Sequence, residues 1–115
     1  MGLFKDKFDF NSRKKESMRI IEKYPDKIPT IVEKLSNSTI LEIEKNKFLV
    51  PLDLSISQFS YILRKSISLK PHEGFFIFIN GVIVPNAMAM HSIYQLNKDD
   101  DGFLYLKYSS ENTFG

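Results

Sequence analysis

Short runs of apolar residues separated by turn-forming residues dominate the chain after residue 26. Five of these runs are rich in β-branched and aromatic residues and are bounded by Pro, Gly, Asn or Ser, which predicts β-strands. Asn80-Gly81 separates two of them and is a strong signal for a two-residue hairpin, because both turn positions need a positive φ. The predicted strands are residues 27–35, 47–51, 75–79, 82–84 and 103–108.

One stretch between the second and third strands repeats its apolar residues with a helical period. Ser55 and Gln58 form a capping box at its start, and Pro71 follows its end. A shorter helix or turn is predicted over residues 88–96. The long helix is predicted over residues 56–69, and its repeating residues are Ile56, Phe59, Ile62 or Leu63, and Ile67.

Two further helices are predicted before the first strand. Phe4 and Phe8 lie one helical turn apart, so residues 1–10 should form a short amphipathic helix that docks on the domain. A mobile arm, or insertion of both rings into lipid, is the alternative. Asn11 and Ser12 are expected to cap the second helix, over residues 12–23.

The second helix has two faces that carry apolar residues. It must end at Tyr24, because Pro25 disfavours helical geometry in the residue before it. One face is expected to point inward, and the other has a single aliphatic residue between an acid and a base. The inward face holds Met18 and Ile21, and the other holds Glu16, Ile20 and Lys23.

The order of these elements predicts an α+β fold of the ubiquitin-like β-grasp type. In this fold a mixed sheet, here of four to five strands, wraps over one helix, and two N-terminal helices precede it. The chain is divided into an N-terminal helical extension at residues 1–24, a ubiquitin-like domain at 25–109 and a flexible C-terminal tail at 110–115 that ends in glycine. The topology by itself does not indicate a function.

Composition argues against several classes of function. The 115 residues include no cysteine, which excludes disulfides, thiolate metal sites and a cysteine nucleophile. His72 and His91 are isolated. Asp99–Gly102 lacks the ligand spacing of a calcium loop and is expected to be a solvated turn, so no metal site is expected. No phosphate-binding glycine loop or nucleophile–base signature is present, so the chain is not expected to be an enzyme.

The charge distribution suggests an acidic partner rather than nucleic acid. Residues 1–50 carry 11 basic and 8 acidic side chains, whereas the whole chain has a net charge of only +2. A basic half of this strength could face an acidic protein or an anionic membrane. It is too weak a bias to indicate nucleic-acid binding.

Several segments at consistent spacing resemble the GABARAP-type autophagy-related ubiquitin-like modifiers, and the similarity runs from about Phe10 to Gly115 with almost no gaps. Such a resemblance implies a protein modifier. The segments that carry it are Lys23-Tyr24-Pro25-Asp26-Lys27-Ile28-Pro29 with Ile31-Val32-Glu33-Lys34, Lys47-Phe48-Leu49-Val50-Pro51, Asp53-Leu54 with Gln58-Phe59 and Leu63-Arg64-Lys65, Phe103-Leu104-Tyr105, and Phe114-Gly115.

The resemblance implies that Gly115 is the residue that becomes conjugated. In the resembled proteins a cysteine protease first exposes the terminal glycine. An E1-like and an E2-like enzyme then transfer the glycine to phosphatidylethanolamine, and the protease later removes this lipid. No cofactor is expected apart from the covalent lipid. Both a longer precursor cut after Gly115 and a chain encoded to end there fit the sequence.

The resemblance also implies docking of aromatic-x-x-aliphatic motifs of cargo receptors and adaptors beside the edge at residues 45–52. The peptide would add a strand, and two pockets would accept its alternate side chains. The aromatic pocket would comprise Glu16, Ile20, Pro29, Lys45, Lys47, Leu49 and Phe103. The aliphatic pocket would comprise Phe48, Val50, Pro51, Leu54, Phe59, Ile62 and Leu63, and the electrostatic rim Lys27, Arg64 and Lys65.

Leu49 and Ile20 are expected to be exposed as part of this groove, whereas Leu54, Phe59 and Leu63 could equally be core residues. The resemblance further implies a monomer in the cytoplasm that moves to the autophagosome membrane when lipidated, and to the vacuole or lysosome. The alternative is a non-conjugated ubiquitin-like adaptor that binds peptides or microtubules.

Overall fold

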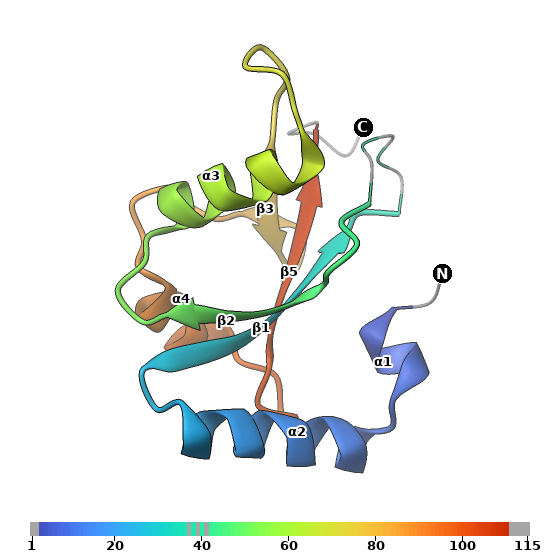
Figure 1. Cartoon of the computed structure of the whole chain (residues 1–115), viewed down its shortest axis with the longest axis vertical. Helices are drawn as coiled ribbons and strands as arrows, with labels where there is room; N and C mark the ends of the chain where they lie inside the picture. Colours follow the sequence, from blue (N-terminus) through green and yellow to red (C-terminus); the bar gives the residue numbers. More distant parts are fainter. Residues whose placement is uncertain (1–2, 37, 39, 41, 111–115) are drawn as a thin grey trace.

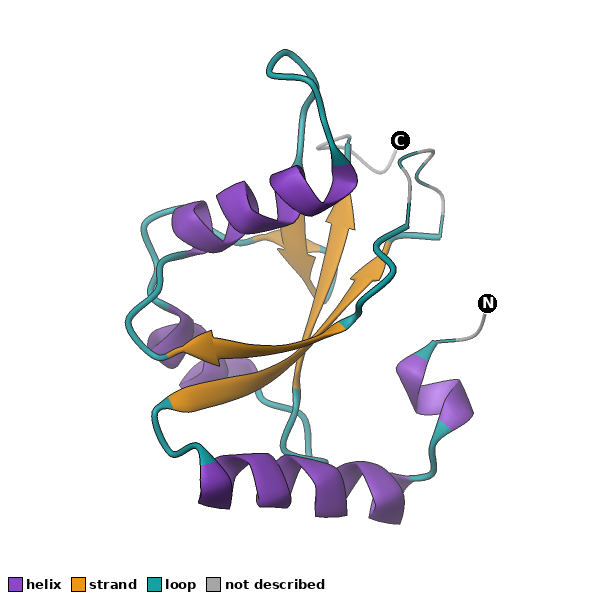
Figure 2. Cartoon of the chain, in the orientation of Figure 1, coloured by secondary structure: helices purple, strands orange, loops and turns teal. Residues whose placement is uncertain are grey.

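The computed structural model describes residues 3–36, 38, 40 and 42–110. Within them the chain forms a five-stranded mixed sheet with helices on both faces (Figures 1 and 2). This confirms the predicted β-grasp fold and the predicted order of its elements. The elements are α1 (Phe4–Lys7), α2 (Phe10–Lys23), β1 (Lys27–Lys34), β2 (Lys47–Pro51), α3 (Ile56–Ile67), β3 (Phe76–Ile79), β4 (Val82–Ile83), α4 (Met90–Asn97) and β5 (Leu104–Ser109).

The strands lie in the order β2-β1-β5-β3-β4. β1 runs parallel to β5, and the other neighbouring strands are antiparallel. Pairing between β1 and β5 begins at Thr30, so Pro29 sits where β1 has β2 beside it but no β5 ladder to interrupt. Because β2 comes first in the strand order, it forms one edge of the sheet, as predicted.

The side chains of α3 fill the larger hydrophobic core, on one face of the sheet. The helix begins with the predicted capping box, in which Ser55 Oγ accepts from the Gln58 amide and the Gln58 side chain accepts from the Ser55 amide. It ends at Ser68, which adopts a left-handed conformation. Its buried residues are Ile56, Phe59, Leu63 and Ile67, which pack with apolar residues of all the longer strands.

The opposite face of the sheet is covered by the N-terminal helices. Phe4 is buried there with Ile20, Ile31 and Phe103, and its ring lies edge-on to that of Phe103 at 5.2 Å between centroids. The Phe4 amide also donates to Glu33 at 2.7 Å. The predicted docking of the first helix is therefore confirmed for Phe4, whereas Phe8 remains exposed beside it.

The predicted inward face of α2 was wrong. Met18 is 57% exposed and Ile21 39%, whereas Ser17 and Ile20 are buried. The predicted start was wrong as well, because the helix begins at Phe10 and the Asp9 carboxylate caps it by accepting from the Ser12 amide. The contact stripe of α2 carries polar side chains, and a search for apolar periodicity cannot detect such a stripe.

The remaining differences lie at element ends. The hairpin turn is confirmed, with φ of 50° at Asn80 and 80° at Gly81. Strands β3 and β4 are each one residue shorter than predicted, and α4 begins two residues later. Within the described part of the chain, no helix is both long and apolar enough to cross a membrane.

Candidate functional site

The outer side of β2 offers backbone groups for a further strand. The Val32 amide donates to the Asn46 carbonyl, and the Leu52 amide donates to the Asp26 carbonyl. Hydrogen-bonded pairs alternate along an antiparallel ladder, so the amides and carbonyls of Lys47 and Leu49 point away from β1. An extended peptide laid along this edge would meet those groups first.

A chain of charges links α2 to this edge. Glu16 on α2 accepts from Lys47 Nζ at 2.7 Å and from both Nε and Nη2 of Arg19 at 2.9 Å. These hydrogen bonds, that of Arg19 above all, lower the pKa of Glu16 to about 2. Glu16 is therefore ionised at neutral pH, and the Glu16–Lys47 pair joins α2 to β2 within the predicted aromatic pocket.

The floor of that predicted pocket is part of the core. Pro29 and Phe103 are buried, and Ile20 is only 1% exposed. The expectation that Ile20 lines an exposed patch was therefore wrong, because this residue packs between α2 and the sheet with Phe4 and Phe103. Leu49 is 36% exposed, which confirms the expected exposure, and Lys45 is exposed as well.

The second predicted pocket divides into a buried layer and an accessible layer. Val50, Phe59 and Leu63 belong to the main core, so they support the pocket from below. Ile62 is 44% exposed on α3, and the Phe48 ring stands edge-on to the Phe59 ring at 5.6 Å. The accessible layer consists of the half-buried Phe48, Pro51 and Leu54 together with the exposed Ile62.

The three predicted rim charges have different surroundings. Lys27 is half-buried at the start of β1, and Lys65 is exposed with its Nζ 4.9 Å from the centre of the Tyr61 ring. The guanidinium of Arg64 donates to the carbonyls of Glu73 and Lys70, at 2.8 and 2.9 Å. Arg64 therefore holds the loop after α3 in addition to contributing charge.

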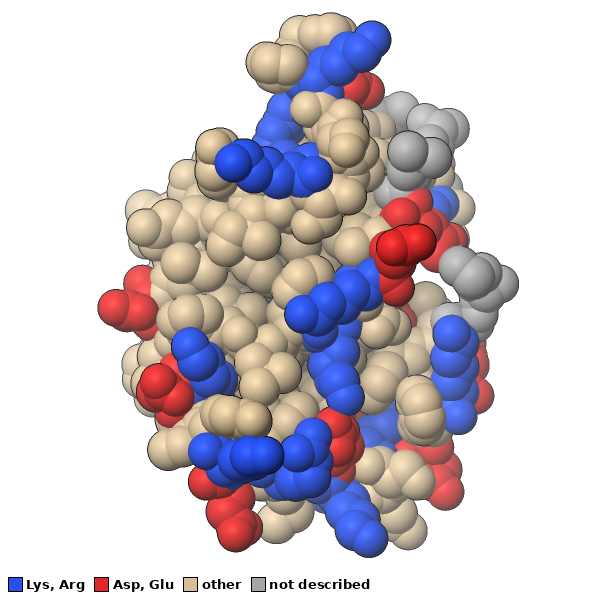
Figure 3. Space-filling model, in the orientation of Figure 1, with Lys and Arg blue, Asp and Glu red and all other residues tan. Residues whose placement is uncertain are grey.

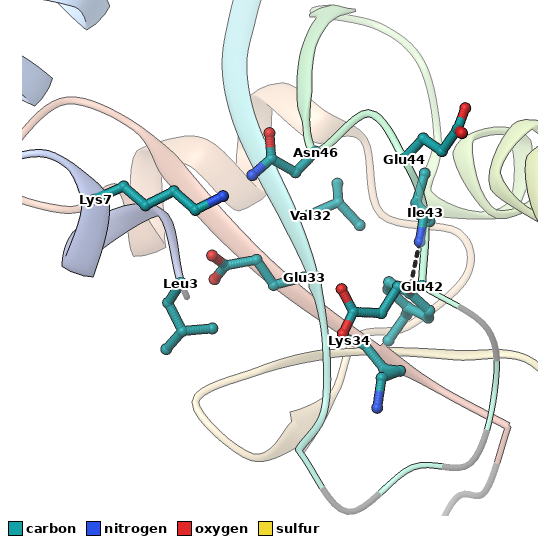
Figure 4. A pocket seen from close by; sticks show the side chains of 10 residues that line it. Leu3, Lys7, Val32, Glu33, Lys34, Glu42, Ile43, Glu44 and Asn46 are labelled. Carbon is teal, nitrogen blue, oxygen red and sulfur yellow. Dashed lines mark hydrogen bonds between the residues drawn. The ribbon is translucent and has the colours of Figure 1, made fainter. Parts of the chain in front are cut away.

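A cavity of about 110 Å³ lies elsewhere, between the N-terminal arm, β1 and residues 42–46 (Figure 4). Lys7 points into it from one side, and Glu33 and Asn46 lie across from it. None of the predicted groove residues lines this cavity. Its small volume and its charged walls make it a gap left by the docking of the arm rather than a pocket for an apolar side chain.

The sequence interpretation missed a buried charge network beneath α2. Asp101 is fully buried, and its carboxylate accepts from Arg13 Nε at 2.8 Å, the Tyr105 hydroxyl at 2.5 Å and the Phe103 amide at 2.9 Å. Burial, reinforced by the hydrogen bond to Asp101, raises the pKa of Tyr105, which therefore stays protonated and donates.

The turn at Asp99–Gly102, which carries Asp101, is also held through its backbone carbonyls. Ser17 Oγ donates to the Asp101 carbonyl, and the Tyr94 hydroxyl donates to the Gly102 carbonyl at 2.7 Å. Gly102 has a φ of 90° and faces the Ser17 side chain so closely that a Cβ there would clash. The prediction of a solvated turn at Asp99–Gly102 was therefore wrong for its last two residues, which are buried.

The predicted conjugation residue, Gly115, lies outside the described residues, as do Glu111 to Phe114. The last described residue, Ser110, follows β5 and lies beside Gly74, where a Cβ would stand 2.9 Å from the Ser110 carbonyl oxygen. Ser110 therefore lies next to the segment that precedes β3.

Comparison with known proteins gives a consistent family. Residues 12–115 match the family described as autophagy protein Atg8, ubiquitin-like. Autophagy-related protein 8 of Schizosaccharomyces pombe is 54% identical over 112 residues, which cover 97% of this chain and 93% of that protein. The protein of the same name from Coccidioides immitis is also 54% identical, with coverage of 97% and 96%.

Solved structures agree with these sequence matches. The crystal structure of Trypanosoma brucei ATG8 superposes with a TM-score of 0.92 at 42% identity, covering 100% of this chain and 99% of that one. Plasmodium falciparum Atg8 in complex with a Plasmodium falciparum Atg3 peptide gives a TM-score of 0.89 at 33% identity, with coverage of 99% and 100%. The chain belongs to the Atg8 family of autophagy-related ubiquitin-like proteins.

Proposed function

We propose that this ubiquitin-like modifier of autophagy is joined through Gly115 to phosphatidylethanolamine and docks aromatic-x-x-aliphatic peptides along β2. The open edge, with the backbone of Lys47 and Leu49 turned outward between two apolar sites, is the observation that carries the docking proposal. Family membership and the terminal glycine support the conjugation proposal. The segments around Pro25, β2 and α3 favour the GABARAP type within the family.

The proposed partners follow from this chemistry. A conjugated glycine requires an E1-like enzyme and an E2-like enzyme, and a cysteine protease for processing and delipidation. The related Plasmodium falciparum Atg8 has been solved with an Atg3 peptide. The chain itself acts as a modifier and docking module rather than as an enzyme. It is a monomer in the cytoplasm, and after lipidation it is bound to the membrane of the autophagosome and reaches the vacuole or lysosome.

Intact mass spectrometry of the protein recovered from membranes of starved cells tests the conjugation proposal. We expect the C-terminal peptide to carry phosphatidylethanolamine on Gly115. A free carboxylate in cells whose lipidation machinery is active would favour instead a non-conjugated adaptor that binds peptides or microtubules. In that case the groove beside β2 would remain the main site.

Two alanine variants should separate the groove from the core that supports it. Leu49→Ala should weaken binding of an aromatic-x-x-aliphatic peptide by about 1–3 kcal/mol with little loss of stability, because Leu49 is exposed at the edge. Ile20→Ala should lower the free energy of unfolding by about 2–5 kcal/mol, because it opens a cavity in the core.

Calorimetric titration and urea unfolding of both variants measure these effects side by side. Equal peptide affinity in Leu49→Ala and the unchanged protein would place the groove elsewhere. An Ile20→Ala protein as stable as the unchanged chain would mean that α2 does not depend on this core.

A further inference from the structure

The tail leaves the domain at one end of the molecule. Strand β5 ends at Ser109, which pairs with Phe76 at the start of β3, and the Ser110 carbonyl lies against Gly74. The C-terminal ends of β5 and α3 and the loop that follows α3 are all at the top of Figure 1. Helix α2 lies at the opposite end of the long axis, along which the Cα trace extends 40 Å.

The length of the tail limits where a membrane can lie. The five residues 111–115 can span at most about 18 Å when fully extended. This distance is less than half of the 40 Å axis. A bilayer that holds Gly115 must therefore pass close to Ser110, and a bilayer that faces this end of the molecule does not reach α2.

The side chains at that end suit an anionic surface. Lys65, Lys70 and His72 are exposed, and basic side chains gather over the last part of α3 and the loop after it (Figure 3). The acid in this loop, Glu73, accepts from the Lys70 amide at 2.8 Å. Glu73 is itself exposed, so two lysines face one acid at this end. We call the exposed residues Lys65, Ser68, Lys70, Pro71, His72 and Glu73 the apical surface.

The loop is held in shape by Arg64. Its guanidinium donates to the carbonyls of Lys70 and Glu73, and the Leu69 amide donates to the Arg64 carbonyl. These bonds fix the backbone on which Lys70 and Pro71 are carried. The apical surface is therefore presented by a structured turn rather than by an unsupported loop.

We propose that the apical surface rests on the headgroups of an anionic membrane once Gly115 is conjugated, an inference that rests on the proposed function. Lys65 and Lys70 supply the attraction to anionic headgroups, and the tail supplies the proximity. Helix α2 and the edge strand β2 then lie away from the bilayer and stay open to receptors, whereas Lys65, a rim residue of the proposed groove, contacts the lipid.

Chemical coupling tests this orientation without conjugation enzymes. The chain has no cysteine, so Gly115→Cys provides a single thiol for a maleimide-modified phosphatidylethanolamine. The coupled protein is compared on phosphatidylcholine vesicles with and without phosphatidylserine, and amide hydrogen exchange is followed by mass spectrometry. We expect exchange in residues 69–74 to slow on the phosphatidylserine vesicles, while residues 10–23 are unchanged.

Charge variants identify the cause. The double variant Lys65→Gln with Lys70→Gln should remove the slowing, because each lysine lost weakens the attraction to anionic headgroups about fivefold. The control Lys15→Gln with Lys23→Gln should retain the slowing. Unchanged exchange in residues 69–74, or slowing confined to residues 10–23, would overturn the proposal. Absence of lipid on Gly115 in cells would contradict the proposed function and would leave the result with the coupled protein unaffected.

Discussion

Replacing Gly115 by alanine should abolish attachment of phosphatidylethanolamine and leave peptide affinity unchanged. Under the proposed function the carboxylate of residue 115 enters narrow active sites of the conjugation enzymes, and a glycine brings no Cβ into them. The groove beside β2 is formed by other parts of the chain, in particular α2, β2 and α3. Conjugation and docking should therefore be lost separately.

Reconstituted conjugation, read by intact mass, measures the first effect, and calorimetric titration with an aromatic-x-x-aliphatic peptide measures the second. Thr113→Ala is the matched control, because it makes a change of similar size in the tail without touching the terminal residue. A lipid adduct on the Gly115→Ala protein would refute the assignment of this residue. Loss of peptide binding in the same protein would mean that the tail belongs to the groove.

The sequence predicted best those elements whose ends are set by local chemistry. β2 has the predicted bounds, because Pro51 ends it and its apolar residues directly precede this proline. The hairpin at Asn80 and Gly81 and the capping box at Ser55 were likewise predictable from neighbouring residues. Each of these signals acts over a few residues and needs no knowledge of the rest of the fold.

The face of α2 could not be predicted in this way. Arg13, Ser17 and Ile20 follow one another at the spacing of a helical stripe, and all three contact the domain. Two of them are polar, and their shared partner Asp101 lies more than 80 residues away. A stripe defined by such distant polar partners looks solvated in the sequence.

The candidate groove illustrates the same limit. The outward direction of Leu49 follows from strand alternation, so its exposure was predictable once β2 was placed at an edge. The burial of Ile20 depends on the docking of Phe4 from α1 and of Phe103 from the last strand region. The sequence around a residue therefore does not show whether its side chain is buried or lines the groove, because that depends on segments far away in the chain.

The second large effect is expected from Asp101→Ala, which should lower the free energy of unfolding by about 3–5 kcal/mol. The substitution leaves the guanidinium of Arg13, itself only 11% exposed in its side chain, without its carboxylate. It also leaves the Tyr105 hydroxyl and the Phe103 amide without their acceptor. Unpaired buried donors of this kind cost more than the original pair contributed.

Asp100→Ala is the matched control, because Asp100 is exposed and its contact with Lys14 uses the backbone carbonyl, which the substitution keeps. Its stability should stay within about 0.5 kcal/mol of the unchanged protein. Urea unfolding measures both variants. Equal stability of the Asp101→Ala and Asp100→Ala proteins would show that the buried network does not hold α2.

The Asp101 network also positions part of the groove, although Asp101 lies outside it. Arg13 and Ser17 join α2 to the turn before β5, and the same helix carries Glu16, which pairs with Lys47 on the edge strand. Loosening α2 should therefore speed amide exchange in residues 10–23 and weaken peptide binding under conditions in which the protein remains folded. Unchanged exchange there, in an Asp101→Ala protein that is nevertheless destabilised, would place the effect in β5 and its turn instead of in α2.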